Sequence, residues 1–131
     1  MNPKIETRYE RGLKRLSEID GRAGEEVVAK VAAISPDFAR YLVEFPFGDV
    51  YARGGLNLRD REIATIAALA AIGHALPQLK VHVAAGLNVG LTRDEIVEII
   101  IQMAVYAGFP VALNALFAAH EVFSAEETRG V

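Results

Sequence analysis

The sequence predicts an all-α fold, and three observations carry this prediction. Apolar residues recur at spacings of three and four along most of the chain, which is the periodicity of helices with one buried face. Proline, glycine and N-capping residues punctuate these segments where helices start and stop. No segment alternates apolar and polar residues as a half-buried strand does. We therefore expect about six to seven helices.

The chain is long enough for one domain. Its 131 residues, of which 52% are hydrophobic and 24% charged, have the composition of an ordinary globular domain with a substantial core. We expect a single domain over residues 1–131. It should comprise an N-terminal helical arm over 1–53, a helical core over 54–123 and a frayed tail over 124–131.

The N-terminal arm begins with two predicted helices. Apolar residues at spacings of four, four and three predict a first amphipathic helix that ends near Asp20 and Gly21. A second helix is expected over 23–33, with valine and alanine on its inward side. The apolar residues of the first helix are Ile5, Tyr9, Leu13 and Leu16.

A third helix of the arm should start at Ser35, an N-cap residue followed by Pro36 in the first turn. Pro46 lies inside its apolar pattern and should end or kink the helix, because proline lacks a backbone N–H. Gly54 and Gly55 then mark the boundary with the core. The arm has too few large apolar residues to be an independent domain.

The helical core contains three or four further helices. Asn57 is an N-cap for the first of them, which should stop near Gly73. The second should start at Pro77 and end before Gly90.

The remaining core helices have equally clear signals. Thr92 and Glu95 have the spacing of a capping box, in which each side chain bonds the backbone N–H of the other residue. Gly108 and Pro110 then break the chain before a last helix, which should end near Phe123.

Two of the predicted helices are apolar almost all round. Residues 63–72 carry no charge, and residues 96–108 carry only Glu98 and Gln102 as strongly polar side chains. A helix without a polar face must be covered on every side, and this chain has few helices to do so. We expect other subunits of a homo-oligomer to supply part of the cover. The alternative is that the N-terminal arm folds back over the core.

Charge and cysteine content exclude several classes of protein. Fourteen Lys and Arg against seventeen Asp and Glu give a net charge of −3, whereas a duplex nucleic-acid binder normally has a basic face. Because there is no cysteine, disulfides, thiolate metal sites and thiol redox chemistry are ruled out. The longest apolar stretch, residues 63–73, is too short to cross a membrane, and the N-terminus has no apolar signal segment, which indicates a cytoplasmic protein. The three histidines lack the spacing of a metal-binding helix, so no metal site is expected.

His82 is the strongest candidate for chemistry. It shares a helical face with Leu79 and Gly86, which predicts an imidazole on an apolar stripe. The ordinary pKa of an imidazole, about 6.5, suits proton transfer near neutral pH. The spacing is also compatible with a core histidine that is satisfied by one partner.

Glu62 is the second candidate. It begins the apolar helix over 63–72, where the helix dipole favours a carboxylate. If it faces a cavity together with His82, burial disfavours its charged form and makes it a candidate proton donor. Otherwise it is solvated, or paired with a Lys or Arg one turn away.

Four more residues are candidates for holding a small anionic substrate. His74 follows Gly73 and can instead be a surface residue at a helix C-terminus. Asn114, an amide in an apolar helix, needs partners if it is buried, and can orient a substrate carbonyl or lock a helix crossing. Arg53 and Arg59 suit carboxylate binding, although charges at such positions are often surface charges only.

Four segments of the core together resemble the carboxymuconolactone decarboxylase family. Their order and spacing carry the resemblance, which extends from about Tyr9 to Phe123. The segments are GLNLRDREI (55–63), LKVHVAA (79–85), NVGLTRDEI (88–96) and YAGFP (106–110). The preceding FGDVYAR (47–53) resembles the segment that precedes this core in the decarboxylases themselves.

This resemblance implies an all-helical, alkylhydroperoxidase D-like fold assembled as trimers or hexamers. Glu62 and His82 match a Glu and a His that run a thiol proton relay with two cysteines in the peroxidase branch of the family. Because the chain has no cysteine, peroxidase chemistry by that mechanism is excluded.

The decarboxylase branch needs neither cysteine nor cofactor. The resemblance implies a small unsaturated lactone bearing a carboxylate as the substrate, a place in aromatic-compound catabolism, and a proton donor for the carbon that loses carbon dioxide. We assign proton transfer to His82, control of its protonation state to Glu62, and the seating of a second carboxylate to Arg53 or Arg59.

Several decarboxylases of this family carry a small residue where Glu62 stands. Two alternatives therefore stay open. One is a relative with a different small-molecule activity, and the other is a non-catalytic oligomer that binds a ligand.

Overall fold

A computed structural model describes residues 5–129, and over this range the chain forms helices and no strand. The prediction of an all-α fold is confirmed. The elements are α1 (Arg8–Ile34), α2 (Pro36–Leu42), the π-helix η1 (Val43–Val50), α3 (Leu58–Ile72), α4 (Leu76–Asn88), α5 (Arg93–Ala107) and α6 (Phe109–Arg129).

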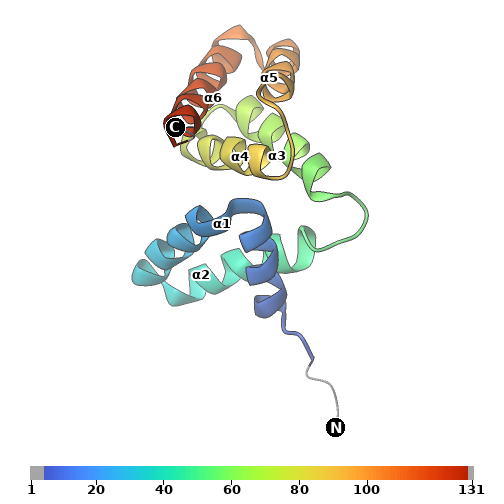
Figure 1. Cartoon of the computed structure of the whole chain (residues 1–131), viewed down its shortest axis with the longest axis vertical. Coiled ribbons are helices and arrows are strands. Elements are labelled where there is room, and N and C mark those ends of the chain that lie inside the picture. The colour runs from blue at the N-terminus through green and yellow to red at the C-terminus, as the bar shows by residue number, and fades with distance from the viewer. Residues whose placement is uncertain (1–4, 130–131) are drawn as a thin grey trace. The chain divides into compact units, whose positions relative to one another are not determined.

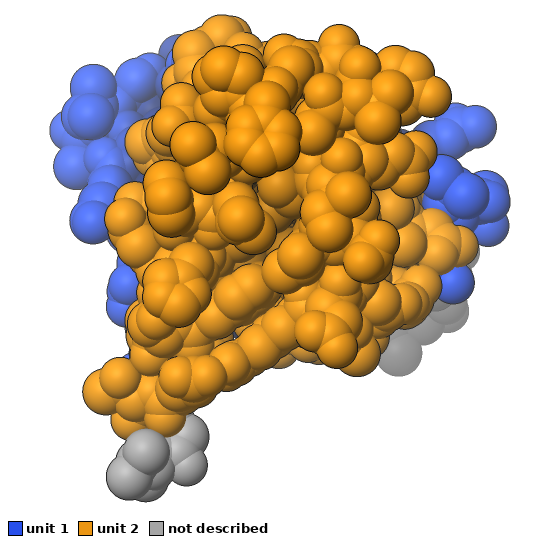
Figure 2. Space-filling model, turned by 90° about the horizontal axis from the view of Figure 1, so that it is seen from above, with its two compact units in different colours: residues 1–57 blue, residues 58–131 orange. Residues whose placement is uncertain are grey.

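The chain divides into two compact units, Met1–Asn57 and Leu58–Val131, which are coloured separately in Figure 2. The boundary follows Asn57, whereas the sequence places it after Arg53, because the regular structure of the second unit begins only at Leu58. A single domain over 1–131 stays a prediction.

In the first unit, α1 is bent at Gly21 (Figure 1). Gly21 has φ 58° and ψ −140°, a backbone conformation that glycine adopts readily because it has no Cβ. The predicted helix end near Gly21 is thus confirmed. α2 also begins as predicted, with Pro36 in its first turn and Ser35 Oγ accepting the N–H of Phe38 at 3.2 Å.

Two glycines let α1 and η1 approach closely. A Cβ on Gly12 would lie 2.2 Å from the carbonyl oxygen of Val43, and one on Gly48 would lie 2.5 Å from that of Arg8. Any side chain at either position would push these segments apart. Pro46 lies within η1, so the predicted helix end or kink takes the form of a wider, π-helical turn.

Asp49 joins η1 to α1 and makes the stability of the first unit depend on pH. Its carboxylate lies 2.6 Å from Arg8 Nη2 and 3.4 Å from Arg11 Nη2. The hydrogen bond from Arg8 lowers the pKa of Asp49 below its ordinary value. Because the folded-state pKa is the lower one, the contact stabilises the fold above about pH 4 and is lost as the pH falls through the lowered pKa.

We therefore expect Asp49→Asn to lower the thermal midpoint at pH 7, and the difference from the parent to shrink as the pH falls through the lowered pKa of Asp49. Thermal melts followed by circular dichroism across this range check the expectation. A difference that persists undiminished in acid would contradict it.

The second unit packs α3, α4, α5 and α6 around one apolar core (Figure 1). Alanines of α6, among them Ala115 and Ala119, are buried there and let α6 lie close to the other helices. No helix among residues 5–129 is both long enough and apolar enough to cross a membrane. The largest core side chains that are completely shielded from solvent come from α3, α4 and α5: Ile66, Leu79, Val83 and Ile96.

The local signals predict the helix boundaries of this unit well. The chain leaves α3, α4 and α5 at or just before Gly73, Gly90 and Gly108, all of which have positive φ. Thr92 and Glu95 form the predicted capping box at the start of α5.

The end of α6 differs from the prediction. The helix continues through Arg129, so residues 124–129 are helical where the sequence predicts a frayed tail, and residues 130–131 lie outside the described range. Arg93, at the start of α5, accounts for the extension. It pairs with Glu127, donates to the carbonyl oxygen of Phe123 at 3.3 Å, and lies over the Phe123 ring.

Candidate functional site

Glu62 and His82 meet between α3 and α4. Glu62 Oε2 lies 2.9 Å from His82 Nδ1. The side chain of Glu62 is 0% exposed, and that of His82 is 18% exposed. The carboxyl group is therefore shielded from water, whereas the imidazole keeps partial access to the surface of the chain. These are the two predicted site residues that the fold brings into contact with each other.

A helical hairpin places the two side chains opposite each other. Glu62 lies in the second turn of α3, and a short connection sends α4 back along α3 so that His82, in the middle of α4, faces it. The sequence predicts an imidazole on an apolar stripe with Leu79 and Gly86. Both of these residues are buried, and the side chain of His82, 18% exposed, lies at the partly accessible edge of the same face.

The contact leaves His82 with one ring nitrogen for other partners. Because Nδ1 faces Glu62, Nε2 is the nitrogen that can reach a substrate. Among the residues that the structure describes, Glu62 Oε1 is buried without a hydrogen-bond partner. A buried carboxylate in this position is costly unless a partner compensates it, and the contact with His82 supplies that partner.

Arg59 is already held by two carboxylates. Its Nη2 donates to Glu95 Oε2, and its Nη1 lies 3.8 Å from Asp60 Oδ1. The pKa of Glu95 is lowered by the hydrogen bond from the Thr92 backbone and, next, by the hydrogen bond from Arg59, so Glu95 is an anion at neutral pH. Arg59 must release one of these partners before it can seat a substrate carboxylate. The sequence predicts the place of Glu95 in a capping box but gives no sign of its pairing with Arg59, which is 36 residues away.

The remaining candidate residues lie at exposed positions. His74 is exposed just after the C-terminal end of α3, whereas Glu62 lies near the N-terminal end of that helix. Asn114 is exposed on α6, so its amide does not need the buried partners that an interior position would require. Arg53 is exposed in the first unit.

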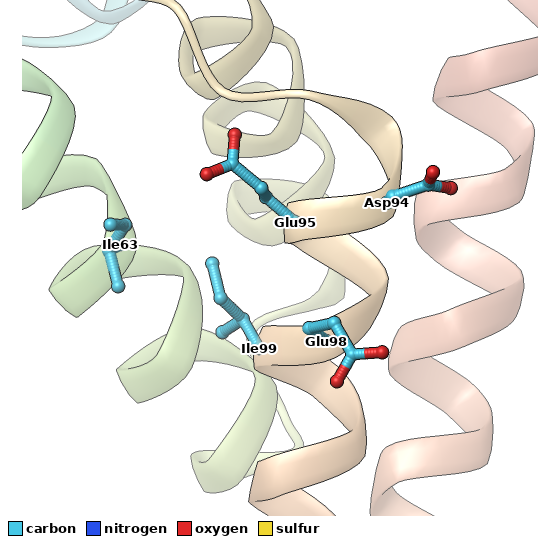
Figure 3. A pocket seen from close by; sticks show the side chains of 5 residues that line it. All are labelled: Ile63, Asp94, Glu95, Glu98 and Ile99. Carbon is cyan, nitrogen blue, oxygen red and sulfur yellow. The ribbon is translucent and has the colours of Figure 1, made fainter.

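A hollow of about 320 Å³ lies between α3 and α5 (Figure 3). Ile63 and Ile99 line it together with Asp94, Glu95 and Glu98 of α5. The carboxyl groups of Asp94 and Glu98 point away from α3, and that of Glu95 is paired with Arg59 (Figure 3). Ile63 directly follows Glu62, so the hollow lies next to the helix turn that carries the buried carboxyl group.

A second hollow, of about 220 Å³, lies between α5 and α6 and is apolar. Within residues 5–129, no three side chains of the types that bind metal ions are grouped closely enough to hold one. The second hollow is lined by Val97, Ile100, Ile101, Ala104, Phe109, Ala112, Leu113 and Leu116.

The sequence matches the model of the carboxymuconolactone decarboxylase family over residues 36–121. The chain belongs to this family. The resemblance seen in the sequence segments is thus confirmed, and the matched region includes Glu62, His82 and the Arg59–Glu95 ion pair.

Relatives of this family member include two decarboxylases. The 4-carboxymuconolactone decarboxylase of Acinetobacter baylyi is 34% identical over 119 residues, which cover 90% of this chain and 88% of the relative. The nitrosuccinic acid decarboxylase of Metarhizium robertsii is 28% identical over 113 residues, which cover 82% of this chain and 76% of the relative. An uncharacterized 15.0 kDa protein of Paracoccus denitrificans is 34% identical over 113 residues, which cover 86% and 79%.

Proposed function

We propose that this protein is a cofactor-free decarboxylase of a small unsaturated lactone that bears a carboxylate. The observation that carries the proposal is the buried contact between Glu62 and His82 in a member of the carboxymuconolactone decarboxylase family. The similarity to the decarboxylase of Acinetobacter baylyi over 90% of the chain supports the type of reaction.

The proposed reaction has two steps. First the bond between the ring carbon and the carboxylate breaks, carbon dioxide leaves, and the electron pair moves onto the lactone carbonyl as an enolate. Then His82 Nε2 delivers its proton to the carbon as the enolate collapses. The pair goes from neutral to singly negative in this step, and a proton from water restores it.

Glu62 suits the task of controlling the protonation of His82, because it contacts Nδ1 and leaves the transfer of the proton to Nε2. A carboxylate against Nδ1 keeps a proton on that nitrogen and stabilises the imidazolium, so that Nε2 also carries a proton and can donate it. The partial exposure of His82 leaves this second nitrogen accessible to a substrate.

A second carboxylate of the substrate needs a cation. Arg53 and Arg59 are the proposed seats, and Arg59 serves if the substrate takes the place of Asp60, whose Oδ1 lies 3.8 Å from Arg59 Nη1. His74 and Asn114 stay candidate substrate-binding residues, although each is exposed in the structure.

Incubation of the purified protein with γ-carboxymuconolactone tests the proposal. We expect loss of the substrate's ultraviolet absorbance together with release of carbon dioxide, with the Acinetobacter baylyi enzyme assayed in parallel. If the relative turns over and this protein does not, the proposed substrate is wrong. Nitrosuccinic acid is the second substrate to assay, because a decarboxylase of that acid is among the relatives. Failure with both substrates would favour the non-catalytic, ligand-binding alternative.

We also propose that the protein assembles as a homo-oligomer, a trimer or a hexamer. No charged residue lies between Ile99 and Ala119, and large apolar side chains of this segment are exposed on the second unit, Val105 at 76% and Tyr106 at 78%. An uncharged apolar face suits contact between copies that each carry a net charge of −3, since like charges repel.

Light scattering should give a mass of several chains, each of 14.2 kDa. Val105→Glu, which places a charge in this face, should lower that mass. Lys30→Glu, at an exposed position of α1, should leave it unchanged. A parent mass of one chain would contradict the assembly and favour cover by the N-terminal arm.

A further inference from the structure

We propose that Glu95 is a positioning residue that holds Glu62 against His82 by gripping Arg59. The inference deepens the proposed function and rests on it for its catalytic meaning, but its geometric part can be tested without a substrate. It starts from the way in which Glu95 uses both of its carboxyl oxygens.

Glu95 links two helix starts. Its Oε1 accepts the backbone N–H of Thr92 at 3.0 Å, and its own N–H donates to Thr92 Oγ1 at 3.0 Å, so the capping box fixes the carboxyl group to the first turn of α5. Its Oε2 accepts from Arg59 in the first turn of α3. The two hydrogen bonds with Thr92 therefore hold the Glu95 carboxylate in one position, from which it binds Arg59.

Arg59 lies three residues before Glu62, which is about one turn along α3. Residues at this spacing are neighbours on the helix surface, so an ion pair that fixes Arg59 also restrains the turn of α3 that carries Glu62. The ion pair thus connects α5 to the same part of α3 that meets His82.

Apolar packing between this part of α3 and α5 is incomplete, because a hollow lies beside Ile63 and Ile99. This hollow is lined by Ile63 and Ile99, and Ile63 directly follows Glu62 in the sequence. Figure 3 shows Glu95 and Ile99 on the side of α5 that faces α3, whereas Asp94 and Glu98 point away from α3. Where packing is incomplete, the ion pair between Arg59 and Glu95 closes the contact between the two helices.

Arg59→Gln is the decisive variant, because its two possible effects on His82 have opposite signs. Removal of a nearby positive charge alone makes the imidazole easier to protonate and moves its titration midpoint to higher pH. Loss of the Glu62 contact removes the stabilising carboxylate and moves the midpoint to lower pH. We expect the ring resonances of His82, followed by NMR in the absence of substrate, to titrate at lower pH in this variant.

Arg93→Gln is the matched control. It also removes an arginine from a helix start of the second unit, but that arginine pairs with Glu127 and not with Glu95. We expect no fall in the His82 midpoint there, and His74 and His120, both exposed, serve as internal references. Arg59→Lys, which keeps the cation, should restore most of the parent midpoint. Lys80, a charged residue on the same helix as His82, pairs with Glu121 at 2.5 Å, and none of these variants replaces either residue.

Glu95→Gln tests the other partner, since glutamine keeps the capping bond but loses the charge that grips Arg59. Removal of a negative charge lowers the His82 midpoint by itself, so the reference is Glu98→Gln, one turn along α5 and also beside the hollow. A larger fall for Glu95→Gln than for Glu98→Gln supports the proposal. This pair of variants also serves if Arg59→Gln does not fold.

A rise or no change for Arg59→Gln, or equal falls for the two glutamate variants, would overturn the positioning role. Activity with γ-carboxymuconolactone is a separate readout. If the parent is inactive but the His82 midpoints move as expected, the proposed substrate fails and the positioning role stands. If the parent is active, kcat should fall with KM little changed in Glu95→Gln, because Glu95 acts on the proton donor, whereas Arg59 is itself a proposed seat for the substrate.

Discussion

His82→Gln is expected to lower the rate of decarboxylation by about 10²–10⁴-fold, the usual range for loss of a general acid, while the protein stays folded. The imidazole is the proposed proton donor, and glutamine fills much of its space without supplying a proton. Because His82 lies beside the fully buried positions of α4, the change should leave the apolar core intact. The rate of carbon dioxide release and the thermal midpoint, measured on the same preparation, check both halves of this expectation.

The control for this variant is His120→Gln. His120 is exposed on α6, so its replacement should leave both the rate and the thermal midpoint unchanged. If His82→Gln instead unfolds the protein or dissociates its assembly, the histidine is structural. If the variant keeps the parent rate, proton transfer by His82 is wrong.

The helix boundaries were predictable because their signals are local. Ser35 with Pro36, Thr92 with Glu95, and the glycines at 73, 90 and 108 each act within one turn of the chain. The end of α6 was not predictable in this way. What extends it is Arg93, which reaches Phe123 and Glu127 from the start of another helix, and no pattern within 124–129 reports that contact.

The two parts of the site, the Glu62–His82 contact and the Arg59–Glu95 ion pair, also differ in how far the sequence predicts them. The pairing of Glu62 with His82 was one of the alternatives that the sequence left open, and the family resemblance favoured it because both residues match the Glu and the His of one proton relay. Arg59 and Glu95 lie among other charged residues near helix starts, where a surface position is the ordinary expectation. Their ion pair depends on how α3 packs against α5, and it became visible only in the folded chain.

Glu62→Gln is expected to lower the rate of decarboxylation without lowering the stability of the protein. Glutamine keeps the size of the side chain and can accept the proton of Nδ1, but it carries no charge to stabilise the imidazolium. Nε2 is then left without a proton at neutral pH, so we expect a rate loss of about 10²-fold or more, as for other histidines that lose their carboxylate partner.

The thermal midpoint at pH 7 should not fall in this variant. In the described part of the chain, Glu62 Oε1 is buried without a hydrogen-bond partner, and an amide in its place is less costly to keep away from water than a carboxylate. Rate measurements with γ-carboxymuconolactone and thermal melts of the parent and of Glu62→Gln test the two statements together. A variant that keeps its rate would show that the carboxylate is not needed for proton transfer. One that loses its rate only because it melts several degrees lower would show that the buried acid serves the fold.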